Sequence, residues 1–171
     1  MGLDGDLYRI VLVLHILCAI VGFGGVLLNG LYAAQAKARK GPEGLAISQA
    51  NFLVSKVAQY FIYGVFVFGF LLVPLSDEAW EFEQTWVWLA MALFLVALGI
   101  SHGLLRPTVE RIIGFQEQLV AMGPPPAGAT GGPPPQVAQL EEQGKRAGMF
   151  AAALQLIFVV ILVLMVFKPG A

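Results

Sequence analysis

Charged residues are scarce in this sequence. Only 12% of the 171 residues are Asp, Glu, Lys or Arg, and the formal net charge is −1, whereas a soluble domain carries about 25% charged residues. Hydrophobic residues make up 58% of the chain. This composition excludes a disordered or collagen-like protein, and the lack of a basic field argues against nucleic acid as a partner. We therefore predict an integral membrane protein, with the lipid bilayer as its first partner.

Residue patterns that carry well-known chemistry are missing as well. Cys18 is the only cysteine, which excludes an internal disulfide and a zinc-finger cysteine set. The sequence contains no P-loop, no GxSxG and no HExxH motif. No pair of acidic residues lies in the apolar stretches, which argues against a glycosidase or a cation-driven antiporter. The sequence leaves open whether the chain is an enzyme.

Long charge-free stretches are what the sequence does contain. A helix rising 1.5 Å per residue needs about 20 apolar residues to cross the ~30 Å hydrocarbon core of a bilayer. Four stretches meet this length, and none alternates like a barrel strand. We predict an all-α, multi-pass protein with a single membrane domain over residues 1–171. The fold expected is an antiparallel bundle of four transmembrane helices, at about 10–34, 52–75, 85–105 and 147–167.

Basic residues indicate the orientation of these helices. Lys37, Arg39 and Lys40 follow the first stretch, whereas residues 76–84 (SDEAWEFEQ) contain four acidic residues and no basic one. Because cytoplasmic connections are enriched in Lys and Arg, we expect the first and third connections inside the cell and both termini outside. The first stretch follows an acidic start and is longer than a signal-peptide core, so we interpret it as a retained helix.

The third connection, residues 108–146, has two parts. Apolar residues recur at helical spacing over 108–122 (TVERIIGFQEQLVAM), which predicts a short amphipathic helix on the inner leaflet. Residues 123–136 are rich in Pro and Gly, which predicts a flexible tether. Helix is expected to resume near Val137 and to continue into the fourth span.

Polar and small residues form one stripe on the first predicted helix. Steps of three and four residues connect His15, Cys18, Gly22, Gly25, Asn29 and Tyr32. One interpretation is a close helix–helix contact permitted by the glycines, with His15 hydrogen-bonded into the bundle. The other is a b-type haem whose iron is bound by His15, because a flat macrocycle needs a helix face without bulky side chains.

The haem interpretation defines a set of candidate site residues. His15 is the metal ligand, and the other cofactor-binding candidates are Cys18, Gly22, Gly25, Met91 and Tyr63. His102 lies about 17 Å from His15 in depth at 1.5 Å per residue, so the two imidazoles cannot share one iron. Met91 is level with His15, and five-coordinate iron remains an alternative to a methionine ligand.

A second polar cluster is expected near the cytoplasmic side. It consists of Asn29, Lys56, Gln59, His102 and Arg106. It could form an anion site, a site for haem propionates or a second cofactor site. Alternatively, Lys56 and Arg106 extend to the lipid headgroups and His102 is simply hydrated.

The segment LHILCAIVGFGGVLL, residues 14–28, contains His15 followed by Phe23, Gly24 and Gly25. In this respect the chain resembles small bacterial four-helix membrane proteins related to copper-resistance protein D, with uncharacterised predicted-integral-membrane relatives and, more distantly, the HemJ-type protoporphyrinogen oxidase. The resemblance implies that His15 binds haem. The Arg that follows the motif in the oxidase and its third-helix Lys have no equivalent here, and no Met or His cluster supports copper loading.

Two hypotheses of function follow. In the first, the chain binds haem b in the bundle for electron transfer or haem handling in the inner (plasma) membrane. In the second, it is a non-catalytic accessory or scaffold subunit that packs against other membrane subunits of a larger complex. A permease is less favoured, because the sequence shows no interrupted helix or inverted repeat.

Overall fold

The computed structural model of this chain describes residues 2–123, 132 and 134–170. All regular elements in these residues are helical: α1 (Asp6–Ala38), α2 (Pro42–Leu75), α3 (Thr85–Ile100), η1 (Ser101–Leu105), α4 (Arg106–Met122) and α5 (Pro135–Phe167). Because α3, η1 and α4 are continuous, they form one rod. This rod, α1, α2 and α5 are each long and apolar enough to cross a membrane, which confirms the prediction of an all-helical chain with four such helices.

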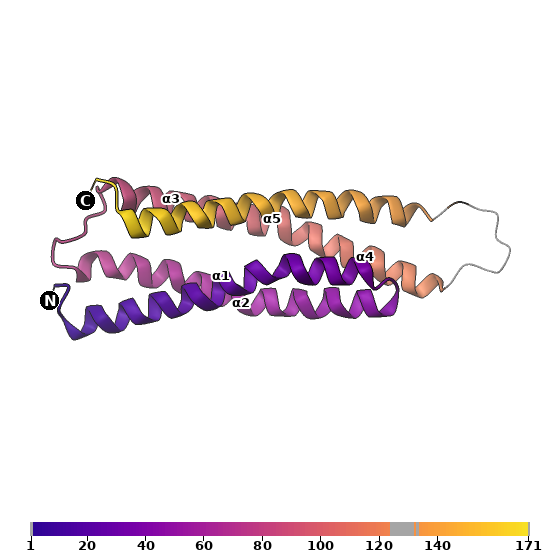
Figure 1. The fold of residues 1–171 in the computed structure, drawn as a ribbon, viewed down its shortest axis with the longest axis horizontal. Coiled ribbons are helices and arrows are strands. Elements are labelled where there is room, and N and C mark those ends of the chain that lie inside the picture. The colour runs from indigo at the N-terminus through magenta and orange to yellow at the C-terminus, as the bar shows by residue number, and fades with distance from the viewer. Residues whose placement is uncertain (1, 124–131, 133, 171) are drawn as a thin grey trace.

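The four rods form two helical hairpins (Figure 1). In the first hairpin α1 contacts α2 far more extensively than it contacts any other helix. In the second, α5 contacts both α3 and α4. Both chain termini lie at one end of the molecule, and the turn between α1 and α2 lies toward the other end (Figure 1).

Local sequence explains where the helices of the first hairpin start and stop. Gly41 precedes α2 with φ 76° and Pro42 is its first residue, a combination that suits glycine's access to positive φ and proline's preference for the first turn. At the other end of α2, the Ser76 hydroxyl accepts a hydrogen bond from the Trp80 backbone N–H at 2.8 Å. This contact begins the turn that leads to α3.

Side chains from all four rods meet in one apolar core. Its buried members are Cys18 from α1, Ile62, Val65 and Val73 from α2, Trp86, Val87, Ala90 and Phe94 from α3, and Ile161 and Leu164 from α5. Aromatic pairs join the hairpins, since the ring centroids of Phe23 and Phe158 are 4.6 Å apart and those of Phe66 and Phe94 are 5.5 Å apart. The interior of the bundle is thus filled by side chains.

The connection between the third and fourth spans differs from its expected arrangement. The amphipathic segment 108–122 is helical, but it continues the rod of α3 and contacts α5 and α2. Its apolar residues, such as Ile112 and Ile113, are half-buried against other helices of the chain. The fourth helix begins at Pro135, so the last two residues of the predicted tether are helical. Residues 124–131 and 133 of that tether lie outside the described residues.

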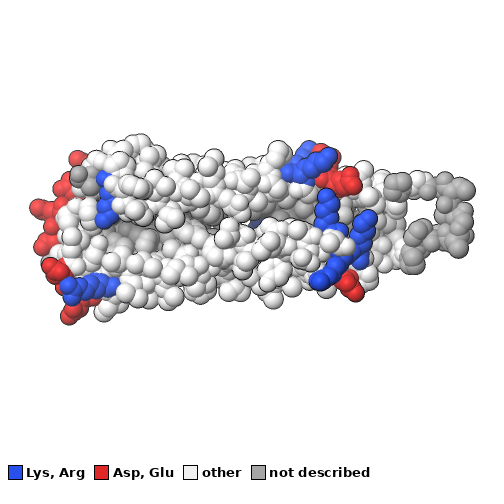
Figure 2. All heavy atoms as spheres, in the orientation of Figure 1, with Lys and Arg blue, Asp and Glu red and all other residues white. Residues whose placement is uncertain are grey.

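Charges gather at the two ends of the rods and leave a band without charge between them (Figure 2). The end that carries the termini has six acidic residues and two basic ones, Arg9 and Lys168. Toward the opposite end lie eight basic and five acidic residues, of which Lys56 and Arg106 are well inside the rods. The uncharged band matches the apolar stretches that were identified in the sequence.

Candidate functional site

The stripe of small and polar residues on α1 lies against α2. A Cβ atom added to Gly22 would be 2.9 Å from Ile62 Cγ1, and one added to Gly25 would be 2.8 Å from Ala58 Cβ. Farther along the stripe, the Ser55 hydroxyl donates a hydrogen bond to Asn29 Oδ1 at 3.1 Å. The glycines therefore allow the two helices to approach closely. This is the close helix–helix contact that was one of the two interpretations of the stripe.

Glycines on α2 complete the same contact from the other side. A Cβ at Gly64 would be 2.7 Å from the sulfur of Cys18, and a Cβ at Gly69 would be 3.0 Å from His15 Cε1. The side chains of Cys18 and His15 therefore occupy the space that a side chain at Gly64 or Gly69 would need. The reciprocal arrangement makes α1 and α2 a tightly fitted pair.

His15 is half-buried beside this contact, and one of its ring nitrogens has a defined partner. Nδ1 lies 2.9 Å from the backbone carbonyl oxygen of Val65, which can only accept a hydrogen bond. Nδ1 therefore carries the proton, and in the neutral ring Nε2 retains its lone pair. No hydrogen bond to Nε2 occurs among the described residues, and this atom is not enclosed in the interior. This tautomer is the one that a metal ligand bound through Nε2 would need.

The space required by a haem on the α1 stripe is occupied. Gly22 and Gly25, expected to lie flat against a macrocycle, instead contact Ile62 and Ala58 of α2. Met91, one candidate for a second ligand, packs against the apolar core. Among the described residues no group of three or more His, Cys, Asp or Glu side chains could hold a metal ion. The imidazole of His15 is thus a suitable ligand for haem iron, but the α1 face that the macrocycle would need is occupied by α2.

A second polar site joins the two hairpins at His102. Its Nδ1 donates a hydrogen bond to the Leu98 carbonyl oxygen at 2.9 Å. Its Nε2 lies 2.6 Å from the Tyr63 hydroxyl and 2.7 Å from Gln59 Nε2, both on α2. The Tyr63 and His102 rings are stacked, with centroids 5.8 Å apart and planes inclined by 21°. We call these three side chains, Gln59, Tyr63 and His102, the His102 site.

The chain matches no protein-family model, no curated protein and no solved structure. The interpretation of both sites therefore depends on their own geometry.

A wide helical turn holds the His102 site. Residues 101–105 form a π-helical segment, in which the Arg106 N–H bonds to the Ser101 carbonyl. Pro107 follows directly, lacks an N–H and would crowd the carbonyl of Gly103 in a regular α-helix. The wider turn relieves this conflict. Single π-turns of this kind are frequent at functional positions.

Only part of the predicted second cluster comes together. Gln59 and His102 are hydrogen-bonded as described above. Asn29 is instead bonded to Ser55, the Lys56 ammonium lies 4.4 Å from the Phe52 ring centroid, and Arg106 forms an exposed ion pair with Glu110 at 3.1 Å. The expected anion site is not assembled from these five side chains.

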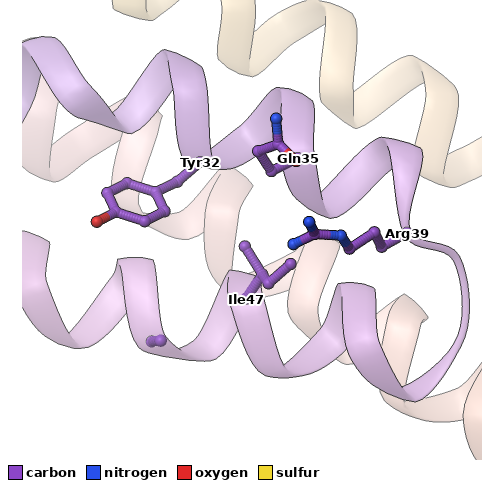
Figure 3. A pocket seen from close by; sticks show the side chains of 5 residues that line it. Tyr32, Gln35, Arg39 and Ile47 are labelled. Carbon is purple, nitrogen blue, oxygen red and sulfur yellow. The ribbon is translucent and has the colours of Figure 1, made fainter.

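Tyr32, at the end of the stripe, lies on the rim of a shallow pocket between α1 and α2. Gln35, Arg39, Ile47 and Ala50 complete its lining. Figure 3 shows the Arg39 guanidinium beside Ile47, with the Tyr32 ring farther along α1. This pocket is at the basic end of the molecule and is separate from His15.

The sequence groups Tyr63 with the haem-site candidates around His15, whereas in the structure its hydroxyl lies 2.6 Å from His102 Nε2. Depth would have identified its partner. Tyr63 is seven residues after Lys56 and His102 is four residues before Arg106, so each lies about 6–11 Å along its helix from the basic residue that borders the charge-free band, at 1.5 Å per residue. Pro107 was the visible signal for the unusual turn.

Proposed function

We propose that this chain is a non-catalytic accessory or scaffold subunit of a larger membrane complex. In this proposal the four rods cross the inner (plasma) membrane as an antiparallel bundle, with both termini outside the cell. The excess of basic residues at the opposite end supports this orientation, because Lys and Arg are enriched on the cytoplasmic side.

Uncovered small residues on the second hairpin carry the proposal. Gly99 and Gly103, four residues apart, are exposed, and a Cβ added to either would meet nothing within 4 Å. Gly148 on α5 has the same open surroundings, and the exposed Ala152 follows it by four residues. In membranes, small residues at this spacing let a second helix approach the backbone closely.

The first hairpin shows how this chain uses such residues when a neighbour is present. Atoms of α2 occupy the space beside Gly22 and Gly25, whereas a Cβ added to Gly99 or Gly103 would meet no atom of the chain within 4 Å. The same packing chemistry is therefore available on the outside of the second hairpin. A transmembrane helix of another subunit is the occupant that it fits.

Extraction of native membranes into polymer-bounded nanodiscs tests the proposal. We expect the wild-type chain in particles much heavier than its own 18.3 kDa plus lipid, as measured by light scattering. Gly99→Leu and Gly103→Leu should reduce that heavy fraction about tenfold, which corresponds to ~1.4 kcal/mol of association free energy. Gly24→Leu is the matched control, because a Cβ added to Gly24 would also meet nothing within 4 Å, but Gly24 lies on α1 and the residues four positions away are Ile20 and Leu28. A wild-type chain that is solitary in native membranes, or equal effects of all three variants, would refute the proposal.

Haem binding for electron transfer or haem handling is the second candidate, and the tautomer of His15 is the observation that favours it. Nε2 keeps its lone pair and has no partner among the described residues. When bound, haem would supply one-electron chemistry, and His15 would hold its iron. The visible spectrum of protein expressed with a haem supply tests this candidate. A Soret band that His15→Ala removes and His102→Ala preserves would support it, and a wild-type preparation without the band would reject it.

A further inference from the structure

The His102 site contains more hydrogen-bond donors than it can use internally. Because Nδ1 donates to the Leu98 carbonyl, the neutral ring offers a single lone pair, on Nε2. The Tyr63 O–H and a Gln59 N–H both point to it, at 2.6 Å and 2.7 Å. One lone pair can be aligned with only one of the two hydrogens. The other donor is therefore available to an acceptor from outside the chain.

The surroundings of this spare donor are aromatic and accessible. Tyr63 is 38% exposed and Tyr60, one turn away, is 74% exposed. Their rings meet edge to face with centroids 6.4 Å apart, while the other neighbour of Tyr63 is the stacked His102 ring. Together these residues present an exposed aromatic wall with a donor on it, close to the basic end of the charge-free band.

We propose that Tyr63, His102 and Gln59 bind the carbonyl oxygen of a lipid-phase quinone head group. The Tyr63 hydroxyl, which makes the shorter contact, keeps its hydrogen bond to His102 Nε2, and the Gln59 amide N–H donates to the quinone carbonyl. The quinone ring lies against the exposed rings of Tyr63 and Tyr60, since offset-stacked and edge-to-face contacts are favourable for aromatic rings. The isoprenoid tail extends along the apolar surface of the band.

Phospholipid ester carbonyls share the acceptor chemistry and are the alternative source. They lack a flat ring, so they would not use the aromatic wall of Tyr60 and Tyr63. The site lies close to Lys56 and Arg106 along the sequence. Both a quinone head group and a phospholipid ester can therefore reach it. The two sources are separated by the choice of lipid in the experiment.

Photolabelling of the full-length protein in vesicles tests the proposal. The probe is an azido-substituted short-chain benzoquinone, and the vesicles contain phosphatidylcholine and phosphatidylglycerol. We expect saturable labelling of peptides that contain Tyr63 or His102. Tyr63→Phe should raise the half-saturating concentration about tenfold, because Gln59 then donates to the vacant lone pair of His102 Nε2 and its hydrogen bond to the ligand is lost.

Tyr32→Phe is the matched control. The Tyr32 hydroxyl has no hydrogen-bond partner among the described residues, Tyr32 lines the separate pocket between α1 and α2, and the substitution keeps the ring, so the half-saturating concentration should change less than about twofold. Tyr63→Phe likewise removes a single oxygen and keeps the ring, so an unfolding curve like that of the wild type verifies that the fold is intact. Non-saturable labelling, or equal responses of the two variants, would overturn the proposal.

A second vesicle preparation with ether-linked lipids, which have no ester carbonyls, distinguishes the two sources. We expect quinone labelling to be the same in ester and ether vesicles. A phospholipid that native mass spectrometry finds bound from ester but not ether vesicles, together with no saturable quinone labelling, would overturn the quinone assignment. Neither result bears on the glycine-mediated association above, which is measured by particle mass.

Discussion

Adding a single methyl group to Gly22 tests whether the close approach of α1 and α2 holds the first hairpin together. In Gly22→Ala the new Cβ would be 2.9 Å from Ile62 Cγ1 and 3.2 Å from the Ile62 backbone nitrogen. Non-bonded carbon atoms prefer about 3.5–4.0 Å, so the helices must separate by roughly 0.6 Å or more. Overpacking of this kind costs about 1–3 kcal/mol.

Gly24→Ala isolates the effect of that contact. Gly24 is on the same helix, two residues away, and its Cβ would meet nothing within 4 Å. Both variants gain the same helix propensity, about 1 kcal/mol, so the difference between them measures the steric conflict alone. We expect Gly22→Ala to have a free energy of unfolding about 2 kcal/mol below that of Gly24→Ala. Titration of the purified protein with SDS in mixed micelles, followed by circular dichroism, gives both values, and equal stabilities would refute the role of Gly22.

Two further substitutions address the ends of the bundle in the same unfolding assay. Gly44→Ala would place a Cβ against the backbone carbonyl oxygens of Ala36 and Arg39, which cannot rotate away, so we expect a loss of about 3 kcal/mol; a loss under 1 kcal/mol would contradict this packing. Trp80→Phe removes the indole N–H that donates to the Tyr8 hydroxyl at 3.1 Å and shrinks the ring beneath the Lys168 ammonium, now 3.8 Å from its centroid. The expected loss is about 1–2 kcal/mol, and wild-type stability would show that this cluster does not fasten the termini.

The small-residue stripe on α1 was predictable, but its neighbour was not. Spacings of three and four residues place His15, Gly22 and Gly25 on one side of any helix. The spacing is the same whether that side meets another helix or a cofactor. Gly64 and Gly69 on α2 lie opposite Cys18 and His15 and show that a helix packs there, but matching the two stripes in advance requires the register of the hairpin.

Depth along the membrane was the most reliable guide to which polar residues meet. It separated His15 from His102, and in the structure these two histidines have different partners. The same depth argument relates Tyr63 to His102, whereas the α1 stripe alone gives no information about residues on α2. A stripe describes one helix, whereas depth relates residues on different helices.

The segment 108–122 shows what periodicity leaves undetermined. Its apolar residues define a side that must be covered, and a membrane surface and a neighbouring helix both satisfy that requirement. The choice depends on the rod being continuous through the π-turn at residues 101–105, which directs the segment along α5. The turn has a local cause in Pro107, but its direction follows from tertiary packing.

The self-contained packing of α1 against α2 has a consequence for biogenesis. A nascent chain that has emerged only as far as residue 76 already contains both partners of that contact and the short turn that joins them. We expect the translocon to release this pair into the lipid as a finished unit while α5 is still being synthesised. The later half of the protein would then assemble on a platform that already exists.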